Sequence, residues 1–151
     1  MQYMFLNGQV AIMVRYCVER YEQVDGGARI DVRRAEPYEG HKHREGAHGY
    51  RVLPVGDGGI YRIDLSIRLD DGSREQRYHH HPHFQDGDVG PRAYDEGLAA
   101  DPVGWSERQL RNLPKLLTEK GYPELAESID IHELEKAMPM IRMAIESSLQ
   151  P

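Results

Sequence analysis

The sequence predicts an α+β fold, in which an N-terminal antiparallel meander of about five strands is followed by a long loop and C-terminal helices. Two observations predict it. Apolar and polar residues alternate over much of the first 81 residues, as in half-buried strands, whereas apolar residues recur at helical spacing from residue 106 onward. The length of 151 residues suits one domain. We therefore expect a single domain, 1–151, with a sheet part at 1–81, an irregular loop at 82–105 and a helical part at 106–151.

Three strands are expected before residue 56, at 9–21, 28–35 and about 49–55, because β-branched and aromatic residues alternate with polar ones there. Residues 25–27 and 56–59 are rich in glycine and aspartate, which is typical of turns. These turns are expected to separate the strands and to make sequence neighbours pair with one another.

The best-specified element is a hairpin formed by residues 60–69 and 73–81. Their side chains alternate in polarity, and Asp71-Gly72 between them is a strong signal for a two-residue turn. In this register the polar side chains of the two strands share one face and form favourable pairs. A slip by one residue would set apolar side chains opposite charged ones, so the first register is expected.

The register of this hairpin places Asp64 opposite His79 and Arg62 opposite His81. An opposite charge favours a protonated imidazole, whereas a like charge disfavours it. We therefore expect Asp64 to raise the pKa of His79 and Arg62 to lower the pKa of His81. Two neighbouring histidines whose pKa values are pushed apart suit acid–base chemistry.

Capping boxes begin helices, glycine ends them, and proline breaks or kinks them. All three signals occur in the last third of the chain. Helices are therefore expected to begin at Ser106 and Asp130, the first is expected to end at Gly121, and breaks or kinks are expected at Pro114 and Pro139.

Charge limits the classes of function. The net charge is −6, and residues 93–151 contribute −5 of it, with six Lys or Arg against eleven Asp or Glu. An acidic chain is a poor non-specific binder of nucleic acid, because affinity for phosphates needs clustered cations. The acidic C-terminal helices are expected to offer a docking surface for a protein partner instead.

Cysteine use and hydropathy favour a cytoplasmic protein. Cys17 is the only cysteine, so neither an intramolecular disulfide nor a Cys-only zinc site can form. This fits a reducing compartment. The N-terminus lacks the basic region and cleavage pattern of a signal peptide, and no apolar run approaches 18 residues. We expect a cytoplasmic protein that does not span a membrane.

The stretch RYHHHPHFQDGD, residues 77–88, carries the candidate site. On a strand, alternate side chains share a face, so His79 and His81 lie on the polar face and His80 on the apolar one. Two imidazoles at i and i+2 can reach one metal ion, and histidine is the commonest ligand for transition metals. Pro82 ends regular strand pairing, so later residues can turn back toward the site. The expected metal ligands from this stretch are His79, His81, His83, Asp86 and Asp88.

A second histidine cluster lies in the loop GHKHREGAHG. His41 and His43 form an H-x-H pair, which also suits one metal. The third strand could bring this loop beside the end of the hairpin, so both are candidate ligands. The expected cofactor is a divalent transition metal, namely Zn, Mn, Fe or Ni.

Three interpretations of the histidines remain open. They can form a solvated polar face, a metal site, or a metal-free acid–base pair in which His79 or His81 acts with His43.

Guanidinium groups suit phosphate, so Arg62 or Arg77 is expected to hold a substrate phosphate. The alternative is that these arginines form surface ion pairs with Asp64 and Glu75.

The leading hypothesis is a small metal-dependent hydrolase, a phosphodiesterase or nuclease, in which the metal lowers the pKa of a bound water. Its expected catalytic residues are His79, His81, Arg77 and Arg62. No complete motif such as H-E-x-x-H, a P-loop or G-x-S-x-G is present. The alternative hypothesis is therefore a non-enzymatic binding module or regulator, such as a component of a prokaryotic toxin–antitoxin or defence system.

Overall fold

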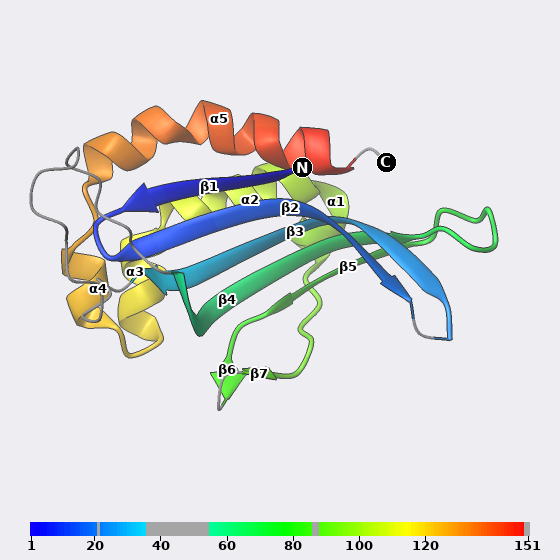
Figure 1. Cartoon of the computed structure of the whole chain (residues 1–151), viewed down its shortest axis with the longest axis horizontal. Coiled ribbons are helices and arrows are strands. Elements are labelled where there is room, and N and C mark those ends of the chain that lie inside the picture. The colour runs from blue at the N-terminus through cyan, green and yellow to red at the C-terminus, as the bar shows by residue number, and fades with distance from the viewer. Residues whose placement is uncertain (21, 36–54, 86–87, 150–151) are drawn as a thin grey trace, which may run out of the picture.

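Five antiparallel strands form one sheet in the order β1-β2-β3-β4-β5, and helices pack against one of its faces (Figure 1). The computed structural model describes residues 1–20, 22–35, 55–85 and 88–149. The strands are β1 (Gln2–Asn7), β2 (Val10–Arg20), β3 (Val24–Ala35), β4 (Val55–Arg68) and β5 (Gln76–His81). The predicted α+β fold, a five-strand meander followed by C-terminal helices, is confirmed.

The strands differ from the predicted set in two places. β1 is not expected from the sequence, because apolar and polar residues do not alternate along it. Tyr3 and Phe5 pack toward the core, and the exposed Met4 and Leu6 on the other face are also apolar. The expected strand at 49–55 lies outside the described residues except at its last position, where β4 begins.

The glycines that were expected to form turns lie inside strands. Residues 25–27 belong to β3, and residues 56–59 belong to β4. A Cβ on Gly27 would lie 2.1 Å from the carbonyl oxygen of Leu65, and a Cβ on Gly59 would overlap an aromatic ring. These glycines therefore permit the close approach of a neighbouring strand or ring, and they do not reverse the chain.

The predicted register of the β4–β5 hairpin is confirmed. Asp64 pairs with His79, and Arg62 pairs with His81. The connection is longer than the predicted two-residue turn, since β4 ends at Arg68 and β5 begins only at residue 76. The pairing, and not the turn, therefore fixes which side chains share a face.

The segment after β5 is more regular than predicted. A short hairpin and one short helix lie within residues 82–105, and no helix in the described ranges is both long and apolar enough to cross a membrane. The remaining elements are β6 (Phe84–Gln85), β7 (Asp88–Val89), α1 (Glu96–Ala100), α2 (Pro102–Arg111), α3 (Leu113–Glu119), α4 (Pro123–Glu127) and α5 (Ile131–Leu149).

Helix α2 begins at Pro102 and not at Ser106. The carboxylate of Asp101 accepts a hydrogen bond from the backbone N–H of Gly104 at 3.0 Å, and proline is favoured at the first helical position. Ser106 lies buried inside the helix, where its hydroxyl donates to the carbonyl of Pro102. The expected capping box is therefore replaced by an earlier aspartate cap.

The other predicted helix boundaries agree with the structure. The helical path is interrupted between α2 and α3, beside Pro114, and Gly121 follows α3 with a φ of 87°. Asp130 caps α5 by accepting from the backbone N–H of Glu133 at 3.1 Å. Helix α5 runs through Pro139 as one continuous helix.

The two faces of the sheet differ in chemistry. The helix-covered face is apolar and forms the core with α2, α3 and α5. Its fully buried side chains include Ile12, Ile30, Ile63, Leu65, Leu110, Leu117 and Ile141. The opposite face carries charged side chains and histidines in rows set by the register, one row being Arg15, Arg29, Asp64 and His79 and the next Met13, Asp31, Arg62 and His81. The candidate site lies on this second, polar face.

Candidate metal centre

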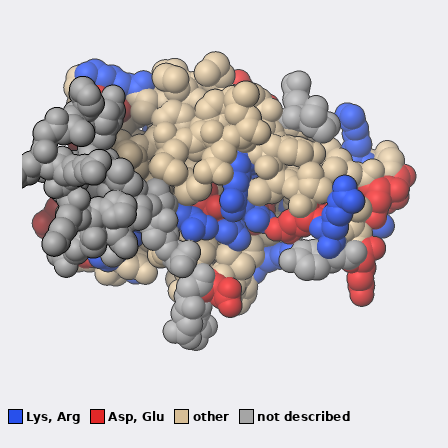
Figure 2. Space-filling model, viewed as in Figure 1, with Lys and Arg blue, Asp and Glu red and all other residues tan. Residues whose placement is uncertain are grey.

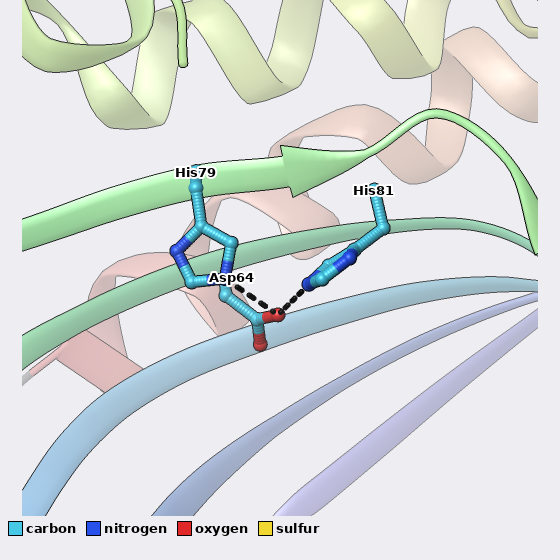
Figure 3. A group of neighbouring side chains, drawn as sticks. All are labelled: Asp64, His79 and His81. Carbon is cyan, nitrogen blue, oxygen red and sulfur yellow. Dashed lines mark ion pairs between the residues drawn. The ribbon is translucent and has the colours of Figure 1, made fainter. Parts of the chain in front are cut away.

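Three side chains converge on the polar face of the sheet, where β4 and β5 pair (Figure 3). Asp64 projects from β4, and His79 and His81 project from β5 toward its carboxylate. Only 5%, 5% and 6% of these three residues is exposed, so water is largely excluded. One donor atom from each lies within 4.8 Å of the others, so the three form a group that could hold a metal ion.

The two imidazoles approach the same carboxylate oxygen. Their Nε2 atoms lie 3.6 Å (His79) and 3.4 Å (His81) from Oδ2 of Asp64. Both separations exceed the roughly 2.7–3.2 Å of an N–H···O hydrogen bond. Two ligands that each lie about 2.0–2.1 Å from a tetrahedral zinc ion are about 3.4 Å apart. The spacing therefore fits donor atoms that share one cation better than donors bonded to one another.

Backbone carbonyls determine which ring nitrogens face Asp64. Nδ1 of His79 lies 2.8 Å from the carbonyl oxygen of Arg77, and Nδ1 of His81 lies 2.7 Å from that of Gly90. A carbonyl can only accept, so each Nδ1 carries a proton, and in the neutral ring Nε2 keeps its lone pair. When both rings are neutral, their two lone pairs and the carboxylate oxygen repel one another unless a proton or a metal ion lies between them. Metal-bound histidines are typically oriented by such a second hydrogen bond.

Arg29 on β3 holds the other oxygen of the Asp64 carboxylate. Its Nε donates to Oδ1 at 2.6 Å, and its Nη2 donates to Glu19. Oδ2 is thereby left to face the imidazoles. Asp64 is oriented as a ligand that offers one oxygen, with an outer hydrogen bond on the second.

The charge states of Asp64 and His79 suit metal binding. Burial would raise the pKa of Asp64, but its contacts with His81 and Arg29 outweigh burial and lower the pKa to about 2. Burial also lowers the pKa of His79 below its ordinary value, and the Arg77 carbonyl and the Asp64 charge oppose this shift without reversing it. Asp64 raises the pKa of His79, as expected, but lost hydration outweighs this attraction, so the net shift is downward. A charged carboxylate and a neutral imidazole are the forms that bind metals.

The segment after β5 positions His81. The backbone N–H of Gly90 donates to the carbonyl of His83 at 2.8 Å, while the carbonyl of Gly90 accepts from His81. A Cβ on Gly90 would lie 2.6 Å from the His83 carbonyl oxygen, so a larger residue would push this segment away. The Phe84 ring occupies the space over Gly59 and seats the β6–β7 hairpin against β4.

A small pocket opens beside Asp64 and His79. Its free volume is ≈ 20 Å³, and one water needs roughly 10–15 Å³. Arg29, Arg77 and Arg92 contribute to its wall. The pocket therefore has room for one water beside Asp64 and His79. The carboxylates of Glu19, Asp25 and Asp64 share its wall with the three arginines.

The structure separates the predicted metal ligands. His79 and His81 lie together with Asp64, whereas His83 and Asp88 are exposed on the segment after β5 and are not part of this group. The other predicted ligands lie outside the described residues, and these are His41, His43 and Asp86.

The predicted catalytic arginines lie in different surroundings. Arg77 lines the pocket beside His79. Arg62 donates from Nε to Asp31 at 2.6 Å, and its guanidinium lies over the Phe84 ring. His80 lies on the opposite, helix-covered face, as predicted, and packs against the indole of α2.

The sequence does not identify Asp64 as a candidate ligand or Arg29 as its partner. The predicted register pairs Asp64 with His79, but the role predicted for the carboxylate is an effect on the pKa of that ring. In the structure, backbone carbonyls orient the rings, which frees the carboxylate to face Nε2. Arg29 comes from β3, which pairs with β4. No turn signal in the sequence predicts this pairing, so no local pattern identifies Arg29 as the partner of Asp64.

One comparison with known proteins gives a match. A family model described as "Domain of unknown function (DUF7700)" matches residues 51–145, which is more than half of the chain. The matched segment contains Asp64, His79 and His81, while Arg29 precedes it. No curated protein and no solved structure matches the chain.

Replacing Arg29 is expected to destabilise the fold. Arg29→Met leaves the buried Asp64 carboxylate without its cationic partner, which should lower the free energy of unfolding by about 3–5 kcal/mol. The double variant Arg29→Met with Asp64→Asn removes the orphaned charge and should recover part of that loss. Urea unfolding of the three proteins measures both effects. A loss below about 1 kcal/mol in the single variant would contradict this pairing.

Proposed function

The chain belongs to the DUF7700 family, and we propose that it is a metal-dependent hydrolase that binds one divalent transition metal ion through Asp64, His79 and His81 and cleaves phosphate esters. The observation that carries the proposal is the convergence of two imidazole Nε2 atoms on one carboxylate oxygen. Two imidazoles and a carboxylate are a ligand set that zinc and iron accept in proteins.

Within the part of the chain that the structure describes, the group offers three protein ligands, which supports a catalytic rather than a structural ion. Structural zinc sites are closed by four protein ligands, whereas catalytic sites keep one position for water. The pocket beside Asp64 and His79 has room for that water. Candidates for a further ligand are His41, His43, His83, Asp86 and Asp88, and the metal content of their alanine variants decides whether the position is open.

The proposed reaction is the hydrolysis of a phosphodiester. A metal ion held by Asp64, His79 and His81 would lower the pKa of a water, and hydroxide would then be supplied near neutral pH. The hydroxide oxygen forms a bond to phosphorus, the bond from phosphorus to the leaving oxygen breaks, and a solvent proton neutralises the leaving alkoxide. The products are a phosphomonoester and an alcohol.

Arginines beside the pocket support a phosphate substrate. Arg77 and Arg92 both line the pocket. Nε of Arg77 is buried and has no hydrogen-bond partner among the described residues, since Oδ1 of Asp25 is 3.8 Å away. This N–H is available to an incoming oxygen, and guanidinium groups stabilise the charge of a phosphoryl group in the transition state.

Metal binding tests the first half of the proposal. Tag-free protein should bind about one Zn²⁺, Mn²⁺, Fe²⁺ or Ni²⁺ per chain and melt at a higher temperature with metal than with EDTA. Asp64→Asn, His79→Ala and His81→Ala should each lose this metal. The exposed His132→Ala is the matched control and should keep it. Substoichiometric metal in elemental analysis, together with an unchanged melting temperature, would contradict the proposal.

Activity on a chromogenic phosphodiester tests the second half. Arg77→Gln and Arg92→Gln should lower kcat/KM by about 10- to 100-fold while metal content stays unchanged, because each removes a cation at the reacting phosphate. Arg68→Gln, whose guanidinium pairs with Asp70 instead, is the control. Activity that survives EDTA would favour the metal-free acid–base mechanism. Bound iron with oxygen uptake and no phosphodiester cleavage would rule out the hydrolase.

A non-enzymatic binding module is the second candidate, and an exposed apolar strip on α5 favours it. Met140 and Met143 are 57% and 53% exposed there, whereas Met138 and Ile141 are buried in the core. Deleting residues 130–151 would therefore unfold the protein and cannot test docking.

Paired substitutions on α5 test this module without disturbing the core. Met140→Glu with Met143→Glu should leave urea unfolding unchanged within about 0.5 kcal/mol, because both side chains face water. If α5 docks a protein partner, the same variant should abolish its capture in a pull-down. Capture by the double variant at the wild-type level would exclude this face of α5 as the docking surface.

A further inference from the structure

A second charged cluster surrounds Asp31, beside the metal centre on the polar face. Asp31 is only 1% exposed. Its Oδ1 accepts from Nε of Arg62 at 2.6 Å, and its Oδ2 lies 3.4 Å from Nη2 of Arg15 and 3.8 Å from Nη2 of Arg33. Three guanidinium groups thus share one carboxylate.

Within the described residues, the charges of this cluster are not balanced. There, Arg15, Arg33 and Arg62 carry three positive charges against the single negative charge of Asp31. Arg29 next to them is different, because two carboxylates bind it. Figure 2 shows basic side chains gathered over β2–β4 on the near face of the molecule. The cluster therefore holds an excess of positive charge in a chain that is acidic overall.

Two donors of the cluster lack an acceptor. Nε of Arg15 and Nε of Arg33 are buried without a hydrogen-bond partner in the part of the chain that the structure describes. Buried polar atoms in native proteins nearly always have a partner. A tetrahedral oxyanion supplies several acceptor oxygens at once and also offsets the excess positive charge.

The cluster lies one step from the metal centre. Arg29 pairs with Asp64, so Asp31, two residues along β3, is a diagonal neighbour of Asp64. Diagonal neighbours in an antiparallel sheet are about 7–8 Å apart. Arg62 links the two clusters, because it pairs with His81 and bonds to Asp31.

We infer that Arg15, Arg33 and Arg62 form an anion subsite that takes a phosphate group, separate from the reacting phosphate at the metal. Its role as part of a substrate site rests on the proposed function, and such a substrate carries a second phosphate beside the reacting one. The binding of phosphate itself needs only the arginines.

Binding of inorganic phosphate to the full chain in EDTA tests the subsite. ³¹P NMR titration should detect binding to the wild type, and Asp64→Asn should bind equally well. Arg15→Gln with Arg33→Gln should weaken binding by about tenfold or more, because charge-assisted hydrogen bonds are lost. Arg108→Gln with Arg142→Gln is the control. It removes the same charge from two ion pairs on α2 and α5 and should not change phosphate binding. If the first double variant does not fold, Arg33→Gln alone is used.

The outcomes separate this inference from the proposed function. Phosphate binding that needs added metal, or that both double variants weaken equally, overturns the subsite. If phosphate binds at the arginines in a protein that takes up no metal, the subsite is supported and the proposed metal-dependent hydrolase function is contradicted. In metal-loaded protein, a nucleoside 3′,5′-bisphosphate should compete with the chromogenic phosphodiester more tightly than the 5′-monophosphate, and Arg15→Gln with Arg33→Gln should abolish that difference. Equal competition in the wild type would show that the subsite takes free phosphate and not a phosphate of the substrate.

Discussion

A charged carboxylate buried on the polar face of the sheet is the constraint on which the rest of the site depends. Burying an ion costs several kcal/mol unless it is paired and hydrogen-bonded. Arg29 satisfies one oxygen of Asp64. The other oxygen faces Nε2 of His79 and of His81, because backbone carbonyls hold the opposite ring nitrogens. The three donor atoms form a group that could hold a metal ion.

The fold makes such a site possible because one face of the sheet forms the apolar core while the opposite face carries the charged side chains and histidines. Helices α2, α3 and α5 cover one face of the sheet and bury its apolar side chains. Because side chains alternate along each strand, every inward Ile or Leu leaves a neighbour that points to the opposite face. The register then aligns these neighbours across β2–β5 in rows of arginine, aspartate and histidine. The candidate metal group of Asp64, His79 and His81 and the arginine cluster around Asp31 lie in neighbouring rows of this face. The rows gather basic side chains on one face of a chain that is acidic overall.

Local sequence signals predicted the parts of the fold that local physics decides. The β4–β5 register follows from side-chain alternation, and it brought Asp64 opposite His79 correctly. Glycine signals failed at residues 25–27, because there glycine serves a close approach between strands and not a turn. The role of Arg29 could not be predicted, since it depends on the pairing of β3 with β4. The tautomers depend in addition on the carbonyl of Gly90, which only the folded segment after β5 brings to His81. Long-range pairing thus decides the chemistry that the histidine pattern only suggests.

X-ray absorption spectroscopy of the metal-loaded protein tests the central claim most directly, because it reports the ligands around the ion itself. With zinc, the account predicts a four-coordinate ion with nitrogen and oxygen neighbours at about 2.0–2.1 Å and the outer-shell scattering of two imidazole rings. The His79→Ala protein, which should lose the metal, should not show this imidazole signal. A shell of oxygen atoms alone, with no imidazole scattering, would place the metal on surface carboxylates and contradict the account.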